Sequence, residues 1–213
     1  MLKRVIKMSN TIITIARSYG SGGRTIGQKL AKDLNIPYYD RELIYMASNR
    51  SGIDIRLFSE NDESVKKNKL TFGDKFGIGK IPPENGKFAS REDIFKCQAM
   101  LIKELAQKSD CIIIGRCANY ILRNSHEKIL RIFIWAPHEI CVKNIMKKFE
   151  ISESEADKMI RQINKHRKEY YQYYTKHEWE DIKNYDLCID TSKFVEEQAV
   201  KLIKNNINFY RSY

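Results

Sequence analysis

The sequence predicts an α/β fold in which a parallel sheet is covered by helices on both of its faces. Four short apolar runs, at residues 11–16, 111–114, 129–135 and 185–190, have the composition of buried strands. Each run ends at glycine, proline or polar residues, and helical patterns lie between the runs. Strands that alternate with helices form right-handed crossovers into one parallel sheet, so ligands are expected at the carboxyl ends of its strands.

The length and composition are those of one compact domain, predicted to span residues 1–213. Of the 213 residues, 42% are hydrophobic and 31% are charged, which suits a core that needs neither disulfides nor a structural metal. Residues 59–90 combine charged runs with glycine and proline, and they are predicted to form a mobile insertion. Residues 150–176 contain a capping box that starts at Ser152 and predicts a long basic helix.

Charge and cysteine content restrict the partners and the compartment. The net charge of +11 creates a positive field that attracts nucleotides and nucleic acids alike. The five cysteines are odd in number, widely spread and without metal-ligand spacing, so free thiols in a reducing cytosol are predicted. The apolar stretch at residues 11–16 is too short for a signal peptide or a membrane span. We therefore expect a cytoplasmic protein without a membrane partner, and a homo-oligomer is left open.

The turn after the first apolar run has the chemistry of a phosphate-binding loop. In the pattern GxxxxGK[ST], backbone amides at a helix N-terminus surround phosphates, the lysine neutralises charge and the hydroxyl reaches magnesium. Residues 18–25 occupy this frame, with Ser18 in place of the first glycine and Arg24 in place of the lysine. The glycines still permit a tight anion-binding turn, and Arg24 still places a cation at the helix start. The residues predicted to hold the donor phosphates are Gly20, Ser21, Gly22, Gly23, Arg24 and Thr25, with Thr25 as the magnesium ligand.

Four segments, taken in order, resemble the cytidylate kinase-like family: residues 16–24, 36–44, 111–118 and 185–191. The motifs are specific in combination, and the resemblance covers nearly the whole chain, with the weakest match in residues 59–90. It implies a three-layer P-loop NTPase fold with a five-stranded parallel sheet, a helical lid and an insertion on the acceptor side. The activity that it implies is ATP-dependent phosphorylation of a nucleoside monophosphate, typically CMP or dCMP, with magnesium as cofactor.

The resemblance also implies roles for cations along the chain. Asp40 and Arg41 stand in the segment that lies beside the acceptor, and Arg116 matches the arginine that grips the acceptor phosphate. The helix in residues 150–176 resembles the lid. Phosphoryl transfer needs positioning and charge neutralisation rather than a protein nucleophile, so mobile cations are the expected machinery. The predicted catalytic cations are Arg24, Arg161, Arg167 and Lys168.

Several alternatives remain open at this point. The departures at Ser18 and Arg24, together with Ile114 where the family often has aspartate, are compatible with a nucleotide-binding regulatory module that has lost transfer. Two further alternatives are a glycine turn that binds no ligand and a phosphotransferase that acts on a different small acceptor. The tyrosines in residues 170–174 could stack nucleic-acid bases, but aromatics at helical spacing more often pack on a core, so a nucleic-acid partner is not expected. Asp190 is expected to cap the final helix.

Overall fold

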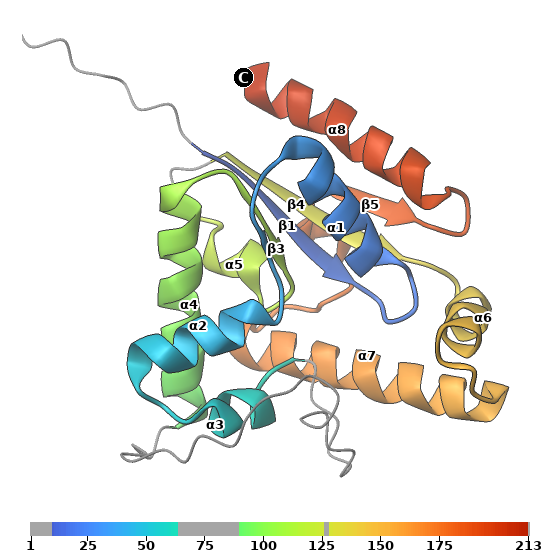
Figure 1. Ribbon diagram of the computed structural model, residues 1–213, viewed down its shortest axis with the longest axis horizontal. Helices are drawn as coiled ribbons and strands as arrows, with labels where there is room; N and C mark the ends of the chain where they lie inside the picture. The colour runs from blue at the N-terminus through green and yellow to red at the C-terminus, as the bar shows by residue number, and fades with distance from the viewer. Residues whose placement is uncertain (1–9, 64–89, 126–127, 213) are drawn as a thin grey trace, which may run out of the picture.

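The computed structural model describes residues 10–63, 90–125 and 128–212, with side chains as far as residue 207 (Figure 1). Most of the predicted insertion at residues 59–90 therefore lies outside the described residues. Five strands form one parallel sheet in the order β2-β3-β1-β4-β5, which confirms the predicted fold class. The strands are β1 (Thr11–Arg17), β2 (Tyr38–Tyr39), β3 (Cys111–Ile114), β4 (Lys128–Trp135) and β5 (Leu187–Asp190).

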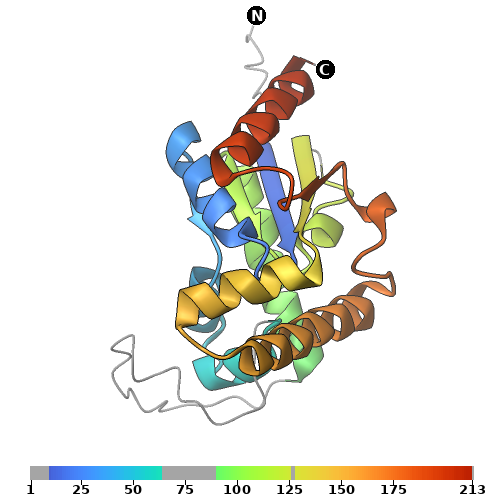
Figure 2. The same ribbon diagram turned by 90° about the vertical axis from the view of Figure 1, so that its right-hand side faces the viewer.

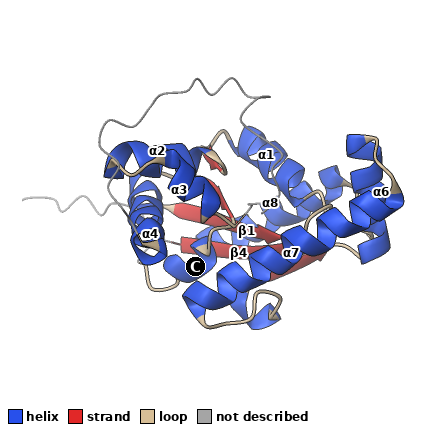
Figure 3. Cartoon of the chain, turned by 90° about the horizontal axis from the view of Figure 1, so that it is seen from below, coloured by secondary structure: helices blue, strands red, loops and turns tan. Residues whose placement is uncertain are grey.

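Helices cover both faces of the sheet and make the predicted three layers. They are α1 (Gly23–Leu34), α2 (Glu42–Ser51), α3 (Ile55–Glu60), α4 (Arg91–Lys108), α5 (Ala118–Ile121), α6 (His138–Phe149), α7 (Glu153–Thr175) and α8 (Glu196–Ser212), with a 3₁₀ turn at Ile182–Asn184. One core cluster joins β1 and β3 to α2 and α4, and a second joins the opposite face to α1 and α8. Figure 3 shows α2, α3 and α4 grouped on one side of the sheet.

The central strands carry β-branched side chains on both faces because both faces are buried. Every residue of β1 and of β3 is buried, as expected for a parallel strand between two helical layers. The register pairs Ile15 of β1 with Ile114 of β3 and Arg17 of β1 with Ile134 of β4. The residues that follow these strands therefore gather at one carboxyl edge.

The long helix α7 crosses this carboxyl edge of the sheet (Figure 1, Figure 2). It begins with the predicted capping box, in which Ser152 and Glu155 satisfy each other's backbone N–H groups. Farther along, the Arg167 guanidinium donates to the carbonyl oxygen of Arg17 at 2.8 Å, which ties the helix to the end of β1. Tyr170 and Tyr171 are buried against the sheet, so the packing interpretation of these two tyrosines is confirmed.

The expectation that Asp190 caps the final helix is wrong. The final helix begins at Glu196, and Asp190 instead accepts the N–H of Ser192 at 2.9 Å, so this carboxylate closes the turn after β5. Asp40 does not cap α2, whose N-cap is Arg41 without a side-chain cap bond; its carboxylate forms ion pairs instead. All five cysteines are free. None of the helices in the described ranges combines the length and apolarity needed to cross a bilayer.

Candidate active site

The glycine turn between β1 and α1 has the geometry of an anion-binding loop. Gly20 and Gly22 have φ of 90° and 77°, in the left-handed region that side chains disfavour, and a Cβ on Gly20 would overlap Cys141 of α6. Within the described residues, the N–H groups of Gly22, Arg24 and Thr25 have no hydrogen-bond acceptor. First-turn amides of this kind attract anions, aided by the helix dipole. The turn can therefore hold phosphate oxygens.

Side chains from the opposite end of the chain hold the turn in this shape. Asn144 of α6 donates to the carbonyl oxygen of Gly20 at 2.8 Å, and Asn164 of α7 accepts the N–H of Tyr19 at 2.8 Å. The Thr191 hydroxyl, just after β5, donates to the carbonyl oxygen of Ser21 at 2.8 Å. Side chains from three distant segments thus fix the shape of the glycine turn.

Beside the turn, at the carboxyl edge of the sheet, lies a group of charged residues that are buried. We call it the buried charge cluster, and each of its six members is at most 6% exposed. Its members are Arg17, Arg116 and Arg167 with Asp40, Asp62 and Glu63. Charged groups are seldom buried without partners, so the partners of each one describe what the cluster can do.

Arg116 lies in the centre of this cluster, 1% exposed. It follows Gly115 at the end of β3, and its Nε lies 3.0 Å from Asp62 Oδ1. Its Nη1 donates to Asp40 Oδ1 at 3.4 Å and to the carbonyl oxygen of Ile114 at 3.2 Å. Burial opposes the charge, but Asp62, Glu63 and Asp40 raise its pKa above the ordinary arginine value. The predicted acceptor arginine is at the ligand edge, and protein carboxylates occupy it.

Arg17 and Glu63 form the shortest contact of the cluster, with 2.5 Å between Arg17 Nη1 and Glu63 Oε1. Burial alone would raise the pKa of Glu63, but Arg17, Arg167 and Arg116 together lower it to about 2. Glu63 is therefore a carboxylate at neutral pH. Arg17 also lies 3.9 Å from Asp40 Oδ1.

Arg167 differs from the other two arginines because it has no ion pair with a carboxylate in the part of the chain that the structure describes. Its Nη1 donates to the Arg17 carbonyl, and its buried Nε has no hydrogen-bond partner within that same part. Burial and the neighbouring Arg17 lower its pKa to about 9, so it remains a cation at neutral pH. An anion bound at the cluster would supply the hydrogen-bond acceptor that the Arg167 Nε lacks.

Asp40 connects the glycine turn to the cluster. Its Oδ2 lies 2.7 Å from Arg24 Nε, and its Oδ1 accepts from Arg116. The Arg24 side chain is 41% exposed, so it borders solvent. Arg41, at the start of α2, is half-buried, and burial together with the charge of Arg24 lowers its pKa. Arg24 from the predicted donor side and Arg116 from the predicted acceptor side therefore both contact Asp40.

Two of the predicted cations lie outside this network. Arg161 pairs with Asp157 one turn earlier on α7, at 2.9 Å, on an exposed surface. Lys168 pairs with Glu180 at 2.7 Å and is half-exposed. Of the three lid cations that the sequence suggested, the structure brings only Arg167 to the cluster. Catalytic roles for Arg161 and Lys168 stay predictions.

Sequence reasoning missed the three residues that complete the site. Arg17 is the last residue of β1, and its place at a strand end beside the glycine turn was a usable signal. Asp62 and Glu63 belong to a charged run that resembled a mobile segment. Nothing in their local pattern points to Arg116, more than fifty positions farther along the chain.

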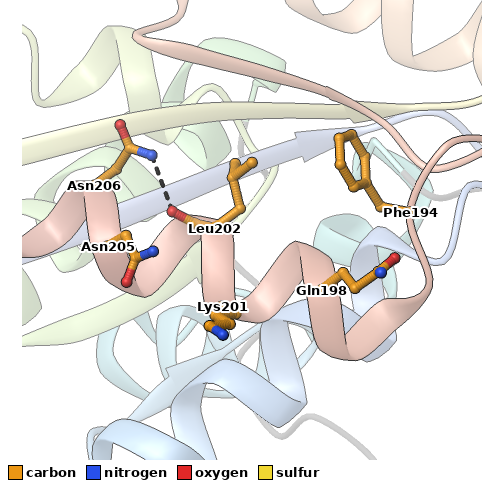
Figure 4. A pocket seen from close by; sticks show the side chains of 6 residues that line it. All are labelled: Phe194, Gln198, Lys201, Leu202, Asn205 and Asn206. Carbon is orange, nitrogen blue, oxygen red and sulfur yellow. Dashed lines mark hydrogen bonds between the residues drawn. The ribbon is translucent and has the colours of Figure 1, made fainter.

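A surface groove elsewhere differs from this site in its chemistry. Figure 4 shows the side chains that line it, from α8 and from Phe194 just before that helix, and the amide of Asn206 donates to the carbonyl oxygen of Leu202 within the helix. Its lining residues are Phe194, Gln198, Lys201, Leu202, Asn205 and Asn206. One lysine without an arginine or a carboxylate offers little to position a phosphoryl group.

The fold and the site together define a class of protein. A parallel sheet of this order, with an anion-binding turn after its first strand and arginines at its carboxyl edge, is the architecture of a P-loop kinase. The chain belongs to the cytidylate kinase-like family, whose model matches residues 12–193. The match includes every member of the buried charge cluster.

Relatives and solved structures agree with this assignment. The chain is 26% identical to the cytidylate kinase of Methanocaldococcus jannaschii over 200 residues, covering 92% of this chain and 97% of that protein. A crystal structure of an uncharacterized protein from Eubacterium ventriosum superposes with a TM-score of 0.67 at 26% identity, covering 93% and 99% of the two chains. The shikimate kinase of Bacteroides thetaiotaomicron shares the fold, with a TM-score of 0.53 at 14% identity and coverage of 93% and 98%.

Proposed function

We propose that this protein transfers a phosphoryl group from ATP to a nucleoside monophosphate, CMP or dCMP, in the cytosol. The observation that carries the proposal is the link through Asp40, which pairs with Arg24 of the glycine turn and with Arg116 of the acceptor side. Donor and acceptor phosphates held at the two ends of this link would be brought together, and positioning is most of what phosphoryl transfer requires.

In this proposal the donor phosphates bind the amides of the glycine turn. Arg24 adds charge at their edge, and Arg41 and Arg116 hold the acceptor. Arg167 offsets charge on the group in transfer, because among the described residues it is the buried cation without a carboxylate partner. Arg24 is permanently charged, as the usual lysine is at neutral pH, so neutralisation survives the substitution.

The residues present fit a magnesium ion bound mainly by nucleotide phosphates. Mg²⁺ keeps several waters and takes few protein ligands alongside substrate phosphates. Thr25, half-buried in the first turn of α1, offers one hydroxyl for this purpose. In residues 10–63, 90–125 and 128–212, no group of three or more His, Cys, Asp or Glu side chains is arranged to hold a metal. A site completed by the nucleotide agrees with that finding.

The test is a coupled ADP-release screen with ATP and magnesium over nucleoside monophosphates and small alcohols. Turnover with CMP or dCMP above all other acceptors supports the proposal. Turnover confined to a sugar or another alcohol would identify a different small acceptor and refute the nucleotide assignment.

A nucleotide-binding module without transfer is the second candidate, favoured by the carboxylates that already engage Arg116. Calorimetry with ATP separates the two functions. Binding of ATP without ADP release in the whole screen would favour the module.

A further inference from the structure

The Glu63 carboxylate sits in a place that has the chemistry of an anion-binding site. One of its oxygens accepts from Arg17 at 2.5 Å, and the other accepts from the backbone N–H of Arg116 at 2.7 Å. The preceding Gly115 has φ of +67°, and a Cβ at that position would overlap the carboxylate. A backbone amide after a left-handed glycine, joined by a guanidinium, is a common way to hold an oxyanion.

A second observation points to the same place. Arg167 is 5% exposed, and its buried Nε has no hydrogen-bond partner among the described residues. Its Nη1 donates to the carbonyl oxygen of Arg17 at 2.8 Å, and the guanidinium of that same Arg17 holds Glu63, so Arg167 lies beside the same site. The two oxygens of the Glu63 carboxylate accept from Arg17 and from the Arg116 amide, and neither accepts from Arg167. A phosphate, with three terminal oxygens, has one more acceptor than a carboxylate.

We propose that Arg17, the backbone N–H of Arg116 and the Arg167 guanidinium form the binding site for the acceptor's phosphate, and that Glu63 occupies this site until the acceptor displaces it. The inference rests on the proposed function and adds to it a substrate-binding residue, Arg17, and an internal competitor. It also specifies the ligand class: a phosphomonoester dianion rather than a neutral alcohol. The competitor is ionised throughout the physiological pH range because the surrounding arginines hold the pKa of Glu63 at about 2 against the effect of burial.

Replacing the competitor is the direct test. Glu63→Gln keeps the shape of the side chain and removes its charge, so we expect the KM for CMP to fall at least about tenfold while the KM for ATP is unchanged. This lower bound corresponds to a binding-competent state that is at most about 10% populated in the wild type. The matched control is Glu60→Gln, which removes the same charge from an exposed position on α3, and its KM for CMP should equal that of the wild type.

A measurement without turnover keeps the inference separate from the proposed function. In phosphate-free buffer, calorimetry should show inorganic phosphate binding at least about tenfold more tightly to Glu63→Gln than to the wild type. Adding Arg17→Gln to that variant should abolish the gain. Glu63→Asp keeps the charge but shortens the reach, so it should give a smaller gain in phosphate affinity, and it is the variant to use if Glu63→Gln does not fold.

The outcomes separate the two ideas. Tighter phosphate binding in Glu63→Gln, without CMP turnover by the wild type, would support the anion site and reject the proposed function. CMP turnover by the wild type, with unchanged CMP and phosphate affinities in both Glu63 variants, would reject the inference alone. A kcat that collapses in Glu63→Gln at constant KM would also overturn it, because Glu63 would then act in the reaction itself.

Discussion

Gly115→Ala should destabilise the protein far more than an ordinary glycine substitution. Gly115 has φ of +67°, where an L-residue costs roughly 1–2 kcal/mol. Its new Cβ would also overlap the ends of the Glu63 and Arg17 side chains, which are flexible in themselves but held together in a buried ion pair. Separating such a pair costs about 3–5 kcal/mol. We therefore expect the free energy of unfolding to fall by about 4–7 kcal/mol.

Gly52→Ala provides the matched control, because Gly52 has φ of +69° and a Cβ added there would meet no described atom within 4 Å. It should lose only the roughly 1–2 kcal/mol of backbone strain. Urea denaturation followed by circular dichroism measures both variants. The loss expected for Gly115→Ala comes near the total free energy of unfolding of many domains, so that variant could fail to fold. The same substitution is therefore also made in the Glu63→Ala background, where the ion pair is already absent. There its effect should shrink to that of Gly52→Ala. Equal losses for the two glycines in the wild-type background would refute the reasoning.

The buried charge cluster and the glycine turn lead to three more predictions. Glu63 has a pKa lowered from 4.5 to about 2, so its contribution is present above pH 4.5 and is lost as the pH falls toward 2; acid unfolding should show a loss of about 3 kcal/mol that Glu63→Gln lacks. Steady-state kinetics should show that Arg116→Ala mainly raises the KM for the acceptor. Arg167→Ala should raise that KM and also lower kcat about 10²–10³-fold, because its guanidinium is proposed both to hold the acceptor phosphate and to offset charge during transfer; unchanged constants in both variants would contradict these roles. Asn164→Ala leaves the Tyr19 N–H without its acceptor, so the free energy of unfolding in urea should fall by about 1–3 kcal/mol and calorimetry should show weaker ATP binding. If neither changes, the turn keeps its shape without Asn164.

The sheet could be predicted from the sequence because its strands are apolar runs with sharp ends. β1, β3 and β4 match the predicted runs to within one residue. The fifth strand starts two residues later than its predicted run, and Tyr185, the first residue of that run, instead caps the 3₁₀ turn of residues 182–184. β2 is different. With only Tyr38 and Tyr39, it has no run to detect, and its place depended on the family resemblance.

The site was predictable only in part. Arg116 and Asp40 were identified through the family resemblance, and Arg116 also follows a strand that the sequence predicts; Arg17 was available because it ends such a strand. Asp62 and Glu63 were not, because ion pairs across more than fifty residues leave no trace in local composition. Arg161 and Arg167 look alike in sequence, yet only Arg167 faces the cluster, since which face of α7 meets the sheet depends on packing.

The composition of the buried charge cluster argues for a ligand rather than for stability. Replacing a buried ion-pair set with well-packed apolar residues is often neutral or stabilising by about 1–4 kcal/mol, so stability alone gives no reason to bury six charges here. A purely structural set would also match each cation with an anion, and Arg167 has no carboxylate partner among the described residues. Anion binding accounts for both features. Guanidinium groups removed from water attract an oxyanion more strongly, and in our proposal Glu63 holds the place of that oxyanion until it arrives.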